Sequence, residues 1–175
     1  MYKFGRKISA LVLAAVVTVS TVLPAFAAGS PVTGKGDSDT TVSGETLADE
    51  TVAVTGVTST TKTATIPSSL DNHKVSVIRT ASIKDKFSTV TLILNSDTKV
   101  EPKVAESKKA KKTKKIIIKA ADGQRITASQ FYKKAFKGFN GKIVVKKSAM
   151  TKKQFKKLKK KLRKGGFDGK IVYKK

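Results

Sequence analysis

The sequence predicts an α/β fold in which short parallel strands stack as a solenoid and end in a β-α-β-α-β unit. The main observation is an internal repeat: Thr-x-x-Gln-Phe occurs at 127–131 and again at 151–155, each time followed by Gly-Phe-x-Gly and Lys-Ile-Val. The two expected strands, 142–145 and 170–173, begin 28 residues apart. A repeat of this length is typical of stacked units that are individually too small to bury their apolar faces.

Residues 1–27 have the three parts of a secretory signal peptide. Lys3, Arg6 and Lys7 precede an apolar run over 8–23, and Ala25-Phe26-Ala27 gives a small-x-small cleavage pattern. A membrane anchor is the alternative, but 16 residues are short for a span of about 20. No second apolar segment follows, so we expect no transmembrane anchor and a secreted, extracellular protein that associates with the cell wall.

Residues 28–60 are predicted to be a disordered spacer. The segment is acidic, rich in Gly, Ser and Thr, and holds no aromatic residue, so it offers little apolar surface to offset the entropy of ordering. Weak alternation over 51–56 leaves an edge strand open as an alternative. The chain has no cysteine, which excludes disulfides and thiolate metal sites.

Residues 61–119 contain apolar runs separated by turns, and they carry a family resemblance. The Thr65-Ile66-Pro67 strand, the anchors Ile83 and Phe87, and the run over 91–93 resemble the repeat of the BspA-like leucine-rich repeat proteins of bacterial surfaces. Lys86 stands where that family usually has Ala. The resemblance extends over roughly residues 60–175 and implies a leucine-rich-repeat-like solenoid in a secreted or surface-attached binding protein.

Residues 120–175 are predicted to be Lys-rich tandem helix–strand units. Each copy begins with a capping box and a hydrophobic staple, and Gly165-Gly166 should end the second helix. In that helix, Phe155 and two leucines share one face and should be buried against strand 170–173. The residues with these structural roles are Thr127, Gln130, Phe131, Thr151, Gln154, Phe155, Leu158 and Leu162.

Charge is concentrated at the carboxyl end. The chain carries +25, and residues 108–175 hold 26 basic and two acidic residues. The second helix is the densest part, and its candidate polyanion-binding residues are Lys152, Lys153, Lys156, Lys157, Lys159, Lys160, Lys161, Arg163 and Lys164. A merely solvated face and an amphipathic membrane-surface helix are the alternatives.

No catalytic constellation is visible, so we expect a protein that is not an enzyme and needs no cofactor or metal. The only histidine, His73, lies in a polar turn with Asp71, and two ligands do not make a metal site. The sequence therefore predicts a secreted, non-catalytic, leucine-rich-repeat-like binding protein held electrostatically by a cell-wall polymer, a glycan or another polyanion, with room for a protein ligand. The alternatives are a basic nucleic-acid-binding protein and the terminal remnant of a larger repeat adhesin.

Overall fold

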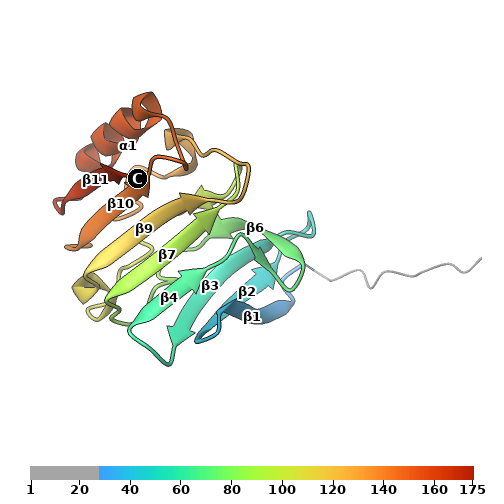
Figure 1. Ribbon diagram of the computed structural model, residues 1–175. Helices are drawn as coiled ribbons and strands as arrows, with labels where there is room; N and C mark the ends of the chain where they lie inside the picture. Colours follow the sequence, from blue (N-terminus) through green and yellow to red (C-terminus); the bar gives the residue numbers. More distant parts are fainter. Residues whose placement is uncertain (1–27) are drawn as a thin grey trace, which may run out of the picture.

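A computed structural model describes residues 28–175 (Figure 1); the predicted signal peptide lies outside the described residues. About 40% of the described residues lie in strands and 13% in helices, and the strands form two sheets. The predicted α/β solenoid is therefore wrong: the fold is mostly β, and one of its sheets mixes parallel with antiparallel pairs.

Sheet A has the order β1-β2-β3-β6-β5, with β8 added on β6. The pairs β1–β2, β2–β3 and β5–β6 are antiparallel, whereas β3–β6 and β6–β8 are parallel. The strands are β1 (Pro31–Asp37), β2 (Thr40–Thr46), β3 (Val52–Ser59), β5 (Ser69–Leu70), β6 (His73–Ile78) and β8 (Lys99–Val100).

The disordered spacer expected over 28–60 is also wrong, because this segment forms β1, β2 and β3. In β2 every second side chain faces the core, and Thr40, Val42 and Thr46 are buried. The buried Thr40 hydroxyl accepts a hydrogen bond of 3.2 Å from Thr65 N. Threonine counts as polar in a composition argument, yet its β-branched side chain fits a strand and its hydroxyl can be satisfied locally.

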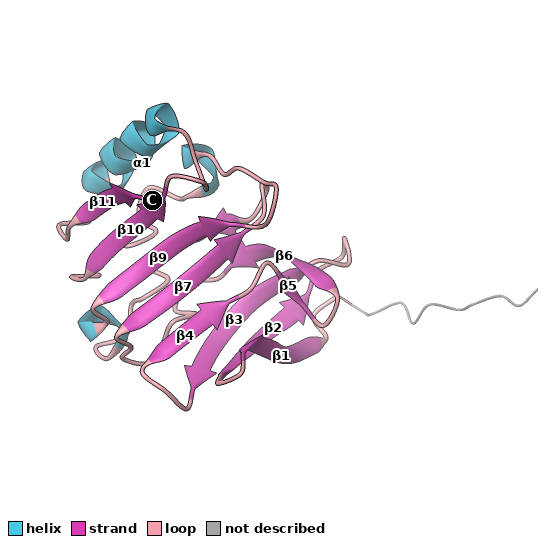
Figure 2. Ribbon diagram, viewed as in Figure 1, coloured by secondary structure: helices cyan, strands magenta, loops and turns pink. Residues whose placement is uncertain are grey.

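Sheet B has the order β11-β10-β9-β7-β4, and all its neighbours are parallel (Figure 2). The parallel pairing predicted for the last three strands is thus confirmed. The strands are β4 (Thr63–Ile66), β7 (Thr89–Leu94), β9 (Lys115–Ala120), β10 (Lys142–Lys146) and β11 (Ile171–Lys174).

A single hydrophobic core joins the two sheets. The four apolar runs of the middle segment do not line up in one sheet as a solenoid would require: β6 belongs to sheet A, whereas β4, β7 and β9 belong to sheet B. The anchors Ile83 and Phe87 are buried in the connection between β6 and β7, as the sequence predicts. The partner that brings β6 into sheet A is β3, the segment for which weak alternation left an edge strand open; it forms, but it lies between β2 and β6 rather than at an edge.

The second predicted helix is confirmed as α1 (Lys152–Lys164), which lies beside β11 (Figure 1). The Thr151 side chain accepts a 3.3 Å bond from Gln154 N at its start. Gly165 follows its last residue, and Gly166 adopts a φ of 86°, a conformation that favours glycine.

The first predicted helix is wrong, because only the short 3-10 helix η2 (Ala128–Gln130) forms there. A second short 3-10 helix, η1 (Ala110–Lys112), precedes β9. The capping box at Thr127 is present, with Thr127 N donating to Gln130 Oε1 at 2.7 Å. Beyond Gln130 the backbone turns to β8 instead: Phe131 forms a parallel bridge with Val100, and Tyr132 N donates to Val100 O at 3.0 Å. This pairing competes with helical hydrogen bonds and prevails.

The aromatic packing also differs from the expected staple. Leu158 and Leu162 are fully buried, but Phe155 is only partly buried and stacks on Tyr173 with 4.7 Å between ring centroids. The prediction that Phe155 is buried against strand 170–173 is therefore wrong, although its ring does contact Tyr173 of that strand. The buried aromatic cluster consists of Phe131, Phe136, Phe139 and Phe167.

Candidate functional site

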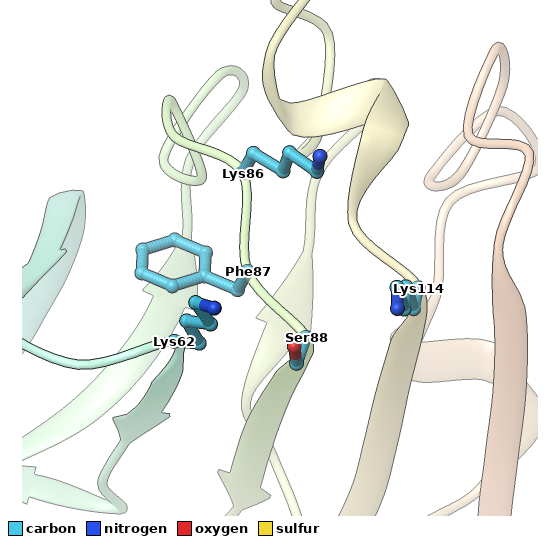
Figure 3. A pocket seen from close by; sticks show the side chains of 5 residues that line it. All are labelled: Lys62, Lys86, Phe87, Ser88 and Lys114. Carbon is cyan, nitrogen blue, oxygen red and sulfur yellow. The ribbon is translucent and has the colours of Figure 1, made fainter.

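Lysines gather at the amino-terminal ends of the parallel strands of sheet B. Lys62 precedes β4, Ser88 precedes β7 and Lys114 precedes β9, and these three residues lie side by side because Ser88 N donates to Lys62 O at 2.6 Å and Lys114 N to Phe87 O at 3.1 Å. Together with Lys86 and Phe87 they line a hollow of about 220 Å³ (Figure 3).

The loop that carries Lys86 is fixed by the buried neighbour Phe87. Phe87 is 3% exposed, and its N–H donates to the buried Thr113 hydroxyl at 3.1 Å. A second hollow shares Lys86 and is lined by Lys108, Lys109 and Lys112 of the η1 region. Among the described residues, the only carboxylate that pairs with any of these lysines is Asp85, 3.9 Å from Lys109 Nζ. This end of sheet B therefore presents several lysines, of which only Lys109 has a carboxylate partner among the described residues.

Helix α1 presents the nine basic residues singled out in the sequence. Lys161 is partly buried and its Nζ donates to Ala128 O at 3.2 Å, while Arg163 donates to Phe167 O at 2.8 Å and lies 5.5 Å from the Phe167 ring centroid. These two have structural roles. The other seven are exposed and, within the described chain, pair with no carboxylate: Lys152, Lys153, Lys156, Lys157, Lys159, Lys160 and Lys164.

Several acidic residues of the segment 28–107 form ion pairs. Arg79 bridges Glu45 at 2.8 Å and Glu101 at 2.9 Å. Burial acts to raise the pKa of Glu101, but hydrogen bonds from Thr80 and Arg79 outweigh it and hold that pKa below its ordinary value of 4.5. Lys74 and Lys103 pair with Asp97 and Glu106. Apart from Asp85 with Lys109, the ion-paired carboxylates of the described chain pair with cations of residues 28–107, so nearly all C-terminal cations have no carboxylate partner.

A third cationic surface lies on the outer face of sheet B, and the sequence analysis missed it. Lys115, Lys142, Lys146 and Lys174 line a shallow hollow there with Ile117 and Val144. The signal was present as Lys-x-x-x-Lys around each of the last three strands, because side chains four residues apart in a strand share a face.

The described residues show no group of three or more His, Asp or Glu side chains able to hold a metal ion. His73 Nδ1 lies 3.0 Å from Glu50 O, and the neighbouring Asp71 has a φ of 49°. Over residues 28–175, no helix is both long and apolar enough to cross a membrane. The one large apolar side chain that is clearly exposed in this range is Tyr132, at 52%.

No protein-family model, curated protein or solved structure matches this chain.

Proposed function

We propose that this protein is an exported, non-catalytic binding protein that attaches to anionic polymers of the cell wall through its C-terminal cations. The observation that carries the proposal is the charge of residues 108–175, +24 from 26 basic and two acidic residues, of which only Lys109 has a carboxylate partner in the described chain. Such a surface attracts polyanions and concentrates them near it. The predicted signal peptide and the resemblance to bacterial surface proteins favour an extracellular polyanion.

Nucleic acid is the weaker candidate for the same charge. Proteins that bind single strands stack bases on exposed aromatic side chains. Here the phenylalanines of the C-terminal half are buried or partly buried, and Tyr132 alone is exposed among the large apolar residues of the described range. The charge would still bind DNA without sequence preference, so the two candidates differ in selectivity rather than in whether binding occurs.

The experiment is a binding titration of the purified chain with poly(glycerol phosphate) at several salt concentrations. Since binding releases condensed counterions, the logarithm of the association constant should fall linearly with the logarithm of salt concentration. Duplex DNA in parallel tests selectivity, and a clear preference for poly(glycerol phosphate) at equal charge is expected. Absence of binding at low salt, or binding that is insensitive to salt, would overturn the proposal.

A further inference from the structure

The last three strands of sheet B carry the same pentad three times: Lys-Ile-Ile-Ile-Lys at 115–119, Lys-Ile-Val-Val-Lys at 142–146 and Lys-Ile-Val-Tyr-Lys at 170–174. Within each pentad the first, third and fifth side chains point to one face, since side chains alternate along a strand. The second residues, Ile116, Ile143 and Ile171, are buried on the core side. The lysines and the central aliphatic residue therefore share the outer face.

The parallel register brings the three pentads into alignment. Lys115 pairs with Lys142, Ile117 with Val144 and Val144 with Val172. At the other end of the pentads, Lys146 pairs with Lys174. Two rows of three lysines result: Lys115, Lys142 and Lys170 in one row, and Lys119, Lys146 and Lys174 in the other. An aliphatic row of Ile117, Val144 and Val172 lies between them.

The spacing of these rows follows from strand geometry. Neighbouring lysines in a row sit on strands about 4.8 Å apart, and the two rows, four residues apart along each strand, are separated by about 13 Å. The aliphatic row is covered by the lysine stems: Val144 is 7% exposed, while Lys115 and Lys142 are partly buried. Figure 2 shows that no helix or strand of the described residues covers this face of β9, β10 and β11.

These six lysines are available for a ligand. Within residues 28–175 none of them pairs with an Asp or Glu side chain, and Lys146 Nζ donates a hydrogen bond to Lys175 O at 2.6 Å. Like charges directly opposite each other on adjacent strands destabilise a sheet. Three repeats of the arrangement accumulate this cost, which a bound row of anions would offset.

From this geometry we propose that the outer face of β9-β10-β11 is the polymer-binding site, and that it takes a thin phosphodiester chain with aliphatic links, poly(glycerol phosphate) in chemical terms. The polymer lies across the strands. Its CH₂ groups lie against the lysine stems that cover the aliphatic row, and its phosphates reach the amines of the two lysine rows. A neutral sugar polymer fits less well, because it carries no anionic groups for the two lysine rows to bind. This site rests on the proposed function and localises it.

The test compares two variants with the same loss of charge. In the first, Lys115, Lys142 and Lys174 are changed to Gln; in the second, the exposed helix residues Lys153, Lys156 and Lys160 are changed to Gln. Affinity for poly(glycerol phosphate) is measured at about 0.15 M salt, where exposed charges more than about 8 Å apart are largely screened. We expect the sheet variant to lose about ten-fold or more in affinity, and the helix variant about two- to three-fold, because only the sheet lysines contact phosphates.

A second measurement does not depend on the variants folding. Lysine acetylation of the wild-type chain, with and without poly(glycerol phosphate), reports which amines the polymer covers. Protection concentrated on the six lysines of the two rows is expected, with little on Lys153, Lys156 and Lys160. Equal loss of affinity in both variants, or protection concentrated on the helix, would overturn this site while leaving the proposed function intact. No binding by the wild-type chain would overturn both. Duplex DNA should not separate the two variants; if it separates them as poly(glycerol phosphate) does, the choice of polymer is wrong.

Discussion

Ten of the 12 acidic residues lie in residues 28–107, whereas 26 of the 37 basic residues lie in residues 108–175. In the first region several charges form ion pairs, as at Arg79 between Glu45 and Glu101. In the second region most cations are exposed and nearly all have no carboxylate partner, so the fold there is held by packing. Five of the six phenylalanines in the described chain lie there, four of them fully buried. The contrast teaches that a highly charged surface can be maintained when an aromatic core and parallel strands oppose the repulsion.

The largest expected effect breaks that aromatic core. Phe136 is 1% exposed, with its ring centroid 6.3 Å from that of Phe131 and 6.5 Å from that of Phe167. Phe136→Ala should lower the free energy of unfolding by about 3–5 kcal/mol, the range for large buried aromatics. Phe155→Ala is the control and should cost clearly less, because Phe155 is only partly buried. Denaturant unfolding of both variants checks this, and an equal or reversed order would contradict the assignment of the core.

A somewhat smaller effect concerns the junction of the two regions. The buried Gln130 side chain donates to Asn95 O at 2.8 Å and to Thr98 O at 2.9 Å, so it joins η2 to the turn after β7. Gln130→Ala should cost about 1–3 kcal/mol for each buried backbone group that it leaves unsatisfied. Gln124→Ala is a matched control, because Gln124 bonds to the exposed Ser96 N. Thermal unfolding should rank Gln130→Ala well below Gln124→Ala in stability; near-equal stabilities would show that water replaces the amide.

Acid should act on the first region and spare the second. The folded-state pKa of Glu101 lies below 4.5, so its contribution to stability is present above that pH and is lost as the pH falls through the folded-state value. Stability measured from pH 6 to pH 3 should fall less steeply in Glu101→Gln than in the wild type. Hydrogen exchange at low pH should show earlier opening in β6 and β8 than in β10 and β11. Uniform opening of both sheets would contradict the division.

Much of the second region could be predicted from sequence, because its signals are local. The capping residue Thr151, the stop at Gly165-Gly166 and the parallel strands all follow from short patterns that the structure confirms. The burial of Phe155 was predicted wrongly, because helical spacing identifies the apolar face of a helix but not which residue on that face is most buried. The helix expected after Thr127 does not form for a non-local reason, because Phe131 pairs with Val100 instead.

The apolar runs of β4, β6 and β7 were visible in the first region, but its segment 28–60 could not be predicted in the same way. Its strands are rich in threonine and glycine, and their burial depends on partners far along the chain, such as Thr40 with Thr65. Composition therefore indicated disorder where the structure has three strands, and only β3 had a signal, the weak alternation over 51–56. Only part of the cationic surface could be predicted. The lysines of α1 are evident in the sequence, whereas the two lysine rows on sheet B can be recognised only when the strand register is known.

The smallest expected effect is on the helix surface. Lys157 is exposed and has like charges at 153, 160 and 161, within three or four residues. Lys157→Ala should change stability by a few tenths of a kcal/mol at most, and in the stabilising direction, since it removes repulsion at i,i+3 and i,i+4. The melting temperature at low salt checks this. A clear destabilisation would mean that Lys157 makes a contact that the structure does not contain.

The central claim is that the cations of residues 108–175 are uncompensated in the free protein and are neutralised by a polyanion. Thermal unfolding as a function of salt, with and without poly(glycerol phosphate), tests it most directly. Without polymer, the melting temperature should rise with salt, because salt screens the repulsion. With polymer, it should be raised at low salt, and the two curves should converge as salt weakens binding. A melting temperature that falls with salt in the free protein, or one that the polymer leaves unchanged at low salt, would contradict the account.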